Sequence, residues 1–212
     1  MVDTRCNNAS LCIPGFQRPQ KNLRGNTITK GILTGLLAVF LLSMGTGTVA
    51  AQDNPLPEEV RKAIEGLAMI PFDEYIESVH FELPDLADGM ISLEDFRGSF
   101  VLLNFWASWC GPCRAEMPSM QALYDDLQGD GLEILAVNQR ESQSIAQDFI
   151  SEFGYSFPVA LDANGVIGYQ YGVRSIPLTY LVDPEGRIIA GKIGAQDWNT
   201  PAIRSAFSTL LN

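Results

Sequence analysis

The sequence predicts a three-layer α/β domain with a mixed central sheet, preceded by an N-terminal appendage. Apolar runs typical of buried strands alternate with segments of helical periodicity from residue 101 onward. The series ends with two strands joined by a tight turn and a last helix, so antiparallel strands join a parallel core. A Cys-Gly-Pro-Cys motif follows the first of these apolar runs.

The appendage divides into a basic leader, 1–31, and an uncharged segment, 32–51. Five of the fourteen Lys and Arg residues precede residue 31, and no charged residue lies between Lys30 and Asp53. An apolar stretch that ends in small residues is typical of a secretory signal peptide, and about 20 uncharged residues also suffice for a transmembrane anchor. Either interpretation leaves the basic leader on the cytoplasmic side of the membrane and places the acidic remainder of the chain outside the cytoplasm.

Charge and ligand content exclude several functions for the rest of the chain. From Gln52 onward the chain contains nine Lys and Arg residues and twenty-four Asp and Glu residues, which gives a formal net charge of −15. Such an acidic surface repels phosphate backbones, so we expect no nucleic-acid partner. With His80 as the only histidine and one cysteine pair, this part lacks the four ligands of a structural zinc site. We expect no metal or cofactor, and no structured role for Cys6 and Cys12 in the leader.

Residues 52–72 are interpreted as a linker with a short helix, and the domain is expected to span 73–212. Apolar residues such as Ile64 and Leu67 recur there at helical spacing. Such a helix either packs on the domain or spaces it from the membrane, and we favour the spacer. Two short apolar runs around Asp88-Gly89 predict a β-hairpin over 81–93.

The remaining elements follow from strand-like apolar runs, helical periodicity and stop signals at glycines. Ser142 or Ser144 is the expected N-cap of the second helix, which Gly154 ends. In chain order the sequence predicts a strand at 101–106, a helix at 112–129, a strand at 132–137, a helix to 153, a strand at 157–161, a helix at 164–171, strands at 178–182 and 187–193, and a helix at 200–211.

The motif Trp109-Cys110-Gly111-Pro112-Cys113 lies between a predicted buried strand and a predicted helix. Free amides and the positive dipole end of a helix N-terminus stabilise a thiolate, so Cys110 is the candidate nucleophile. Cys113, one turn further, can attack the resulting mixed disulfide and is the candidate resolving cysteine. Pro112 suits the first helical turn, and Gly111 keeps the approach to Cys110 open. The motif therefore predicts a redox-active disulfide rather than a structural one.

Residues 103–118, which read LNFWASWCGPCRAEMP, resemble the thioredoxin superfamily and, within it, exported reductases of the TlpA/ResA type. The resemblance covers about residues 79–212. It implies a thioredoxin fold, three-layer α/β/α with a mixed central sheet, an N-terminal β-hairpin and an αβ element inserted around 144–161. It also implies a cis-proline that faces the cysteines, and Ile176-Pro177 matches that motif.

Two positions modify the implied mechanism. Asn104 stands six residues before Cys110, where cytoplasmic thioredoxins usually have a buried aspartate, and it cannot accept a proton. Glu116 corresponds to an acidic residue thought to tune the cysteines of the ResA-like group. We expect Glu116 to be a catalytic general acid or base near Cys113, its pKa raised by burial. The alternative is an exposed helix carboxylate.

The same resemblance places the substrate beside the cysteines. We expect the substrate-binding surface to comprise Trp109, Gly111, Pro112, Ile176 and Pro177, with an extended segment pairing along the backbone of Ile176. Trp109 is expected to be a partly exposed platform. His80 is expected at the surface or in packing rather than in catalysis.

The resemblance implies an extracytoplasmic thiol-disulfide oxidoreductase, a protein disulfide reductase, that is monomeric. Its implied partners are exported protein thiols and disulfides, such as apocytochrome c or copper-protein cysteines, and a membrane thiol electron donor; residues 32–51 would contact the membrane if uncleaved. One alternative is a peroxiredoxin-like peroxidase, which needs Pro and Thr where Leu103 and Ala107 stand. Another is a copper chaperone of the Sco type, which has a wider cysteine spacing and a distal histidine.

Overall fold

A computed structural model describes residues 55–212, so the leader 1–31 and the segment 32–51 lie outside the described residues. The helices are α1 (Glu58–Gly66), α2 (Gly111–Leu127), α3 (Gln143–Phe153), α4 (Val166–Gln170) and α5 (Pro201–Leu210), with 3-10 turns η1 (Leu93–Phe96) and η2 (Gln128–Asp130). The strands are β1 (Ile70–Glu77), β2 (Glu82–Pro84), β3 (Met90–Ser92), β4 (Phe100–Trp106), β5 (Leu132–Gln139), β6 (Val159–Asp162), β7 (Leu178–Val182) and β8 (Arg187–Ile193).

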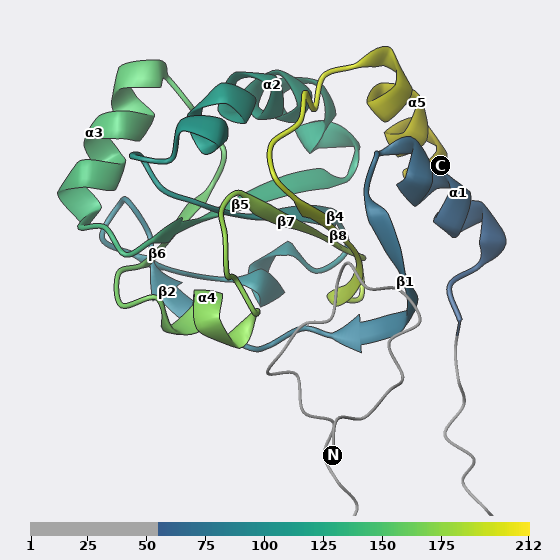
Figure 1. The fold of residues 1–212 in the computed structure, drawn as a ribbon, viewed down its shortest axis with the longest axis horizontal. Helices are drawn as coiled ribbons and strands as arrows, with labels where there is room; N and C mark the ends of the chain where they lie inside the picture. Colours follow the sequence, from purple (N-terminus) through teal and green to yellow (C-terminus); the bar gives the residue numbers. More distant parts are fainter. Residues whose placement is uncertain (1–54) are drawn as a thin grey trace, which may run out of the picture. The chain divides into compact units, whose positions relative to one another are not determined.

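Six strands form one mixed sheet in the order β1-β8-β7-β4-β5-β6 (Figure 1). Strands β4, β5 and β6 are parallel, whereas β7 pairs antiparallel with both β4 and β8, and β1 pairs antiparallel with β8. Strands β2 and β3 form the predicted hairpin, in which Leu83 pairs with Ile91. Helix α3 and strand β6 occupy the place predicted for the inserted αβ element.

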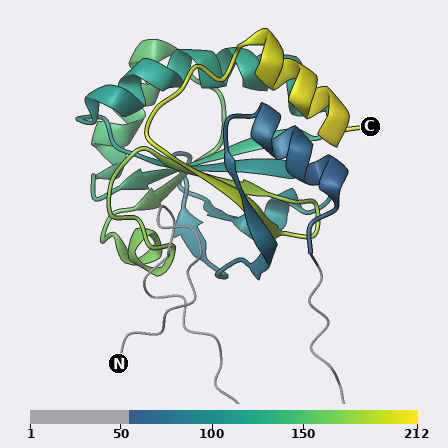
Figure 2. The same ribbon diagram turned by 45° about the vertical axis from the view of Figure 1, so that its right-hand side comes forward.

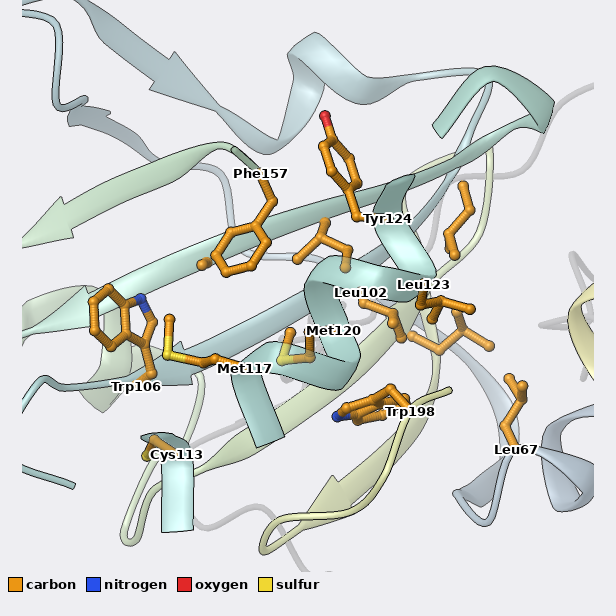
Figure 3. Close-up of a cluster of buried hydrophobic side chains, with 14 of the residues drawn as sticks. Leu67, Leu102, Trp106, Cys113, Met117, Met120, Leu123, Tyr124, Phe157 and Trp198 are labelled. Atoms are coloured by element: carbon orange, nitrogen blue, oxygen red, sulfur yellow. The ribbon is translucent and has the colours of Figure 1, made fainter. Parts of the chain in front are cut away.

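Side chains alternate between the two faces of the sheet and create one core on each. Along β4, Leu102 and Trp106 belong to one core, and Leu103 and Phe105 belong to the other. Helices α1, α2, α3 and α5 cover the first face, while α4 and the β2–β3 hairpin cover the second (Figures 1 and 2). Figure 3 shows side chains of α2 packed against β4 in the first core. The predicted three-layer architecture is confirmed.

The expectation that the helix in 52–72 is a spacer is wrong. Ile64 and Leu67 are fully buried, and α1 packs against α5, where Phe207 is also fully buried. The apolar stripe is therefore part of the first core. Strand β1 was not predicted, and it begins at Ile70, within the predicted linker. Its register with β8 shifts between Pro71 and Ile76, which breaks the alternation expected of a strand.

Local signals placed most element ends within a few residues. Ser142, not Ser144, is the N-cap of α3, and its hydroxyl accepts the Ile145 N–H at 3.4 Å. Gly154 ends α3 in the left-handed region, as expected. Within the described part of the chain, none of the helices has the length and apolar character needed to span a bilayer.

Candidate active site

The two cysteines lie where β4 passes into α2, on the carboxyl side of a central strand. Cys110 is the N-cap of α2, and its sulfur accepts the backbone N–H of Cys113 at 3.2 Å. Pro112 occupies the first turn, where the missing N–H costs no helical hydrogen bond. Cys110 and Cys113 form a disulfide, so the structure represents the oxidised state of the pair.

The surroundings of the disulfide are supplied by the loop before β7. The Ile176-Pro177 peptide bond is cis, as the resemblance implied, and the Ile176 carbonyl oxygen lies 3.7 Å from Cys110 Sγ. Trp109 is 69% exposed, whereas Cys113 is fully buried. A Cβ on Gly111 would meet nothing within 4 Å, so the face of the disulfide at Gly111 is open.

Glu116 lies one helical turn after Cys113, on the same face of α2, and is only 2% exposed. Asn104 Nδ2 donates to Glu116 Oε1 at 3.0 Å. The indole N–H of Trp198 donates to Oε2 at 3.2 Å, and the backbone N–H of Gln196 donates to the same oxygen at 3.3 Å. The carboxyl group is therefore held by three neutral donors from β4 and the loop before α5.

Burial raises the pKa of Glu116 to about 7, because the apolar surroundings disfavour the charged form more than the hydrogen bonds from Trp198, Asn104 and Gln196 favour it. The predicted burial and direction of the shift agree with this environment, and the alternative of an exposed carboxylate is wrong. Glu116 also borders a surface pocket of about 430 Å³ that Ser119 and Gln196 line. A buried group that titrates near neutral pH and borders a solvent-filled pocket can exchange protons with water.

Asn104 has a structural role that the sequence did not indicate. Its amide donates to Glu116 and also to Thr179 Oγ1 on β7, at 2.9 Å. A side-chain amide does not accept a proton near neutral pH, so Asn104 does not replace an aspartate, but it orients the carboxylate of Glu116. The donors Trp198 and Gln196 were missed, because they lie about 80 residues from Glu116 in the sequence.

A second buried carboxylate, Glu141, fixes the loop before the cysteines and was also missed. Its carboxylate accepts the Ser108 backbone N–H at 2.8 Å, the Ser108 hydroxyl at 2.5 Å and Asn138 Nδ2 at 2.7 Å. Ser108 stands two residues before Cys110. Glu141 therefore ties the end of β5 to the loop that carries Cys110.

The remaining predicted residues lie as follows. Gly111 and Pro112 are exposed at the start of α2, Ile176 is half-buried and Pro177 is buried. His80 is exposed and pairs with Glu94 through a 2.7 Å contact between Nδ1 and Oε1. Its position at the surface agrees with the expectation.

A family model for the AhpC/TSA family matches residues 77–190, more than half of the chain. The chain belongs to the AhpC/TSA family. Members similar to this chain include the thiol-disulfide oxidoreductase ResA of Bacillus thuringiensis strain Al Hakam, 38% identical over 120 residues. That match covers 57% of this chain and 69% of the relative. The ResA of Geobacillus thermodenitrificans is 42% identical over 120 residues, covering 55% and 69% respectively.

Solved structures of similar proteins share the fold. A protein of Chlorobium tepidum described as a thiol:disulfide interchange protein DsbE has a TM-score of 0.61 and 31% identity, covering 66% of this chain and 99% of that one. StoA from Bacillus subtilis has a TM-score of 0.52 and 30% identity, covering 62% and 96%. This member of the AhpC/TSA family is a thiol-disulfide oxidoreductase with a thioredoxin fold.

Proposed function

We propose that the chain is an extracytoplasmic protein disulfide reductase in which Cys110 attacks and Cys113 resolves. In the reduced protein the Cys110 thiolate attacks a substrate disulfide, forming a mixed disulfide and releasing one substrate sulfur as a thiolate. Cys113 then loses its proton and attacks Cys110 Sγ, which forms the disulfide of the present structure and frees the second substrate sulfur. Two electrons pass from the protein to the substrate.

The single observation that carries this assignment is the asymmetry of the disulfide at the start of α2. Cys110 is 4% exposed and lies beside the open Gly111 and the exposed Trp109, while Cys113 is fully buried. Cys110 is therefore the sulfur nearer to the surface and the one that we propose a substrate reaches. We assign Trp109, Gly111 and Pro112 to the substrate-binding surface on the same ground, together with the Ile176-Pro177 loop that contacts Cys110.

Glu116 is proposed as the general base for Cys113. It lies one turn away on the same buried face of α2, and its pKa of about 7 lets it take a proton from the thiol near neutral pH. In the reverse direction the protonated acid returns that proton. The pocket beside Gln196 gives the proton a route to solvent.

The proposed direction of reduction rests on Pro112, because a Gly-Pro pair between the two cysteines is the pair of the thioredoxin motif. The potential itself depends on how strongly the reduced Cys110 thiolate is stabilised, so its measurement decides the direction. Export is supported by the basic leader and the apolar segment 32–51. Exported protein thiols and disulfides are the proposed substrates, and a membrane thiol carrier is the proposed electron donor.

The peroxidase alternative is less well supported. The positions that would hold Pro and Thr are Leu103 and Ala107, and both side chains are fully buried. They offer no hydroxyl to a peroxide.

The reduction potential of the full chain, measured against a dithiothreitol or glutathione series, tests the direction. A value near that of thioredoxin, about −270 mV, supports a reductase, and one near that of DsbA, about −120 mV, makes the protein an oxidant. The Cys110→Ser variant is the control, because it has no Cys110–Cys113 couple to titrate.

A further inference from the structure

A second surface pocket, of about 430 Å³, lies beside the disulfide. Trp109, the neighbour of Cys110, lines it, as does Ile176, whose carbonyl oxygen lies 3.7 Å from Cys110 Sγ. Arg140 and Arg174 also line it, and we call it the arginine pocket. An extended substrate segment held at Cys110 would therefore carry its neighbouring side chains over this pocket.

Arg140 and Arg174 are exposed and lack a carboxylate partner. Among residues 55–212 neither forms an ion pair with Asp or Glu, and the residues that line the arginine pocket include no acid. Two arginines elsewhere in the domain form such pairs: Arg187 pairs with Asp183 and Arg204 with Asp126. The arginine pocket therefore offers two guanidinium groups to an external anion.

The backbone holds Arg140 at the pocket. Its φ is 59°, in the left-handed region, and its N–H donates to the Asp162 carbonyl oxygen at 3.0 Å. The side chain lies across Gly165, where an added Cβ would come within 2.3 Å of Arg140 Nε. The Arg140 side chain thus packs against a glycine at the edge of the pocket.

The arginine pocket is positively charged, whereas the domain as a whole is acidic. Residues 55–212 contain nine Lys and Arg against twenty-three Asp and Glu, a net charge of −14. An acidic partner is repelled by this surface in general and attracted where the cations lack partners. Trp109 and Tyr169, 69% and 79% exposed, add aromatic faces to the same pocket. Exposed aromatic and arginine side chains together are typical of polypeptide-binding surfaces.

We propose that the arginine pocket binds an acidic side chain of the substrate polypeptide, close to the cysteine that Cys110 attacks. The inference rests on the proposed function and names its substrate class: protein segments in which Asp or Glu stands within a few residues of the reactive cysteine. Arg140 and Arg174 pair with that carboxylate, and Trp109 and Tyr169 pack against the apolar part of the segment.

The test measures mixed-disulfide formation in the full chain carrying Cys113→Ser, which stops the reaction after the first attack. Two peptides are used, identical except for Asp or Asn beside a cysteine that is disulfide-bonded to the neutral thiol 2-mercaptoethanol. We expect the Asp peptide to react about fivefold faster at low salt, and the difference to shrink at high salt. The ratio between peptides is compared across variants, so their intrinsic reactivities cancel.

The Arg140→Gln/Arg174→Gln variant should reverse this preference, because only the repulsion by the acidic surface remains. The matched control is Lys62→Gln/Arg97→Gln, which removes the same charge from exposed positions. Arg97 precedes the opposite end of β4 from the cysteines, about 20 Å away at the usual rise of a strand. The control should keep the preference for Asp.

The possible failures are distinct. If the Asn peptide reacts but the Asp peptide has no advantage, or if the advantage survives in Arg140→Gln/Arg174→Gln, the arginine pocket is not an acid-binding site, and the proposed function stands. If neither peptide reacts, the assignment of Cys110 fails as well. Oxidised glutathione also bears carboxylates. If Arg140→Gln/Arg174→Gln slows only the reaction with oxidised glutathione, the arginine pocket binds a small disulfide and the proposed substrate class is wrong.

Discussion

Cys110 and Cys113 are three residues apart, yet their surroundings are opposite. On the Cys113 side, Glu116 is enclosed by Asn104 and Trp198 and is almost inaccessible to solvent. On the Cys110 side, exposed aromatic and cationic side chains line an open pocket. The first side contains a titratable carboxyl group held by neutral hydrogen-bond donors, and the second contains two arginines that form no ion pair among residues 55–212.

We propose that the Cys113 side serves proton transfer and the Cys110 side serves recognition. A buried carboxyl group with a pKa raised to about 7 suits proton exchange with a buried thiol near neutral pH. An exposed surface suits partners of varied sequence. Each of the following variants alters one side and tests whether the other is affected.

The largest expected effect is the loss of catalytic turnover in the Cys113→Ser variant. Catalytic turnover should fall to background, because the mixed disulfide at Cys110 has no internal thiol to resolve it. Mass spectrometry of the variant after incubation with a disulfide peptide should show a stable adduct. Cys110→Ser treated in the same way should show none. A stable adduct on Cys110→Ser would mean that a substrate reaches Cys113. That result would contradict the difference in accessibility between the two cysteines.

The stability of the protein should depend on Glu116 in a defined direction. Its pKa rises from 4.5 to about 7 on folding, so the folded state holds the proton more tightly than the unfolded state. Its contribution is therefore fully present below about pH 4.5 and is lost as pH rises to about 7, by about 3 kcal/mol in the free energy of unfolding.

Chemical denaturation of wild type and Glu116→Gln across this range measures that dependence. The variant should lose less stability than wild type as pH rises. Glu133→Gln is the matched control, since burial also raises the pKa of Glu133, which is more exposed and lies on β5 away from the cysteines. Parallel curves for wild type and Glu116→Gln would show that folding does not raise the pKa of Glu116.

Turnover in Glu116→Gln should fall about a hundredfold, because Cys113 loses its general base. In wild type the rate of resolution should rise with pH and level off above about 7, as Glu116 becomes a carboxylate. The variant should lack this step, while its first attack by Cys110 proceeds at the wild-type rate. Stopped-flow fluorescence of Trp109 and its neighbours can follow both steps. An equal loss in both steps would assign Glu116 to packing alone.

Glu141→Ala should destabilise the protein by about 2 kcal/mol, because three donors from Ser108 and Asn138 lose their buried acceptor. Thermal unfolding measures the loss. Glu152→Ala, an exposed carboxylate on α3, serves as the control and should leave stability unchanged.

Trp109→Ala should have the smallest effect on stability, within about 0.5 kcal/mol, because the side chain is exposed. Its effect should fall on KM for peptide disulfides, with kcat and the reduction potential unchanged. A shifted potential would show that Trp109 acts on the disulfide itself and belongs to the chemistry rather than to recognition.

Local sequence signals predicted one side of this site better than the other. The strand-to-helix position of the cysteines follows from local patterns, whereas the cis bond before Pro177 and the buried Glu116 were expected from the resemblance of short motifs to the TlpA/ResA type. The partners of Glu116 follow from neither, because Trp198 and Gln196 reach it only after the chain has crossed the sheet. The arginine pocket is likewise assembled by tertiary structure, with Arg140 and Arg174 coming from separate loops.

The same limit explains the errors at the N-terminal end of the domain. The apolar stripe of helix α1 is visible in the sequence. Its packing against α5 and the first core is visible only in the structure. Strand β1 was missed because its polar residues and irregular pairing lack the alternation that identifies strands. Elements with a regular local pattern could be predicted from the sequence. The packing of α1 and the strand β1 depend on residues distant in the sequence, and they could not.

The irregular pairing of β1 also affects how the sheet ends. Unpaired strand edges invite other extended chains to add to the sheet. The bulge and Pro71 interrupt the edge at β1, and Pro55 bridges to its outer side at Glu74. At the other edge, the β2–β3 hairpin meets β6 through the Asp85–Ala160 bridge. An isolated bridge thus covers part of each border of the sheet, which leaves less free edge for a second chain to add to.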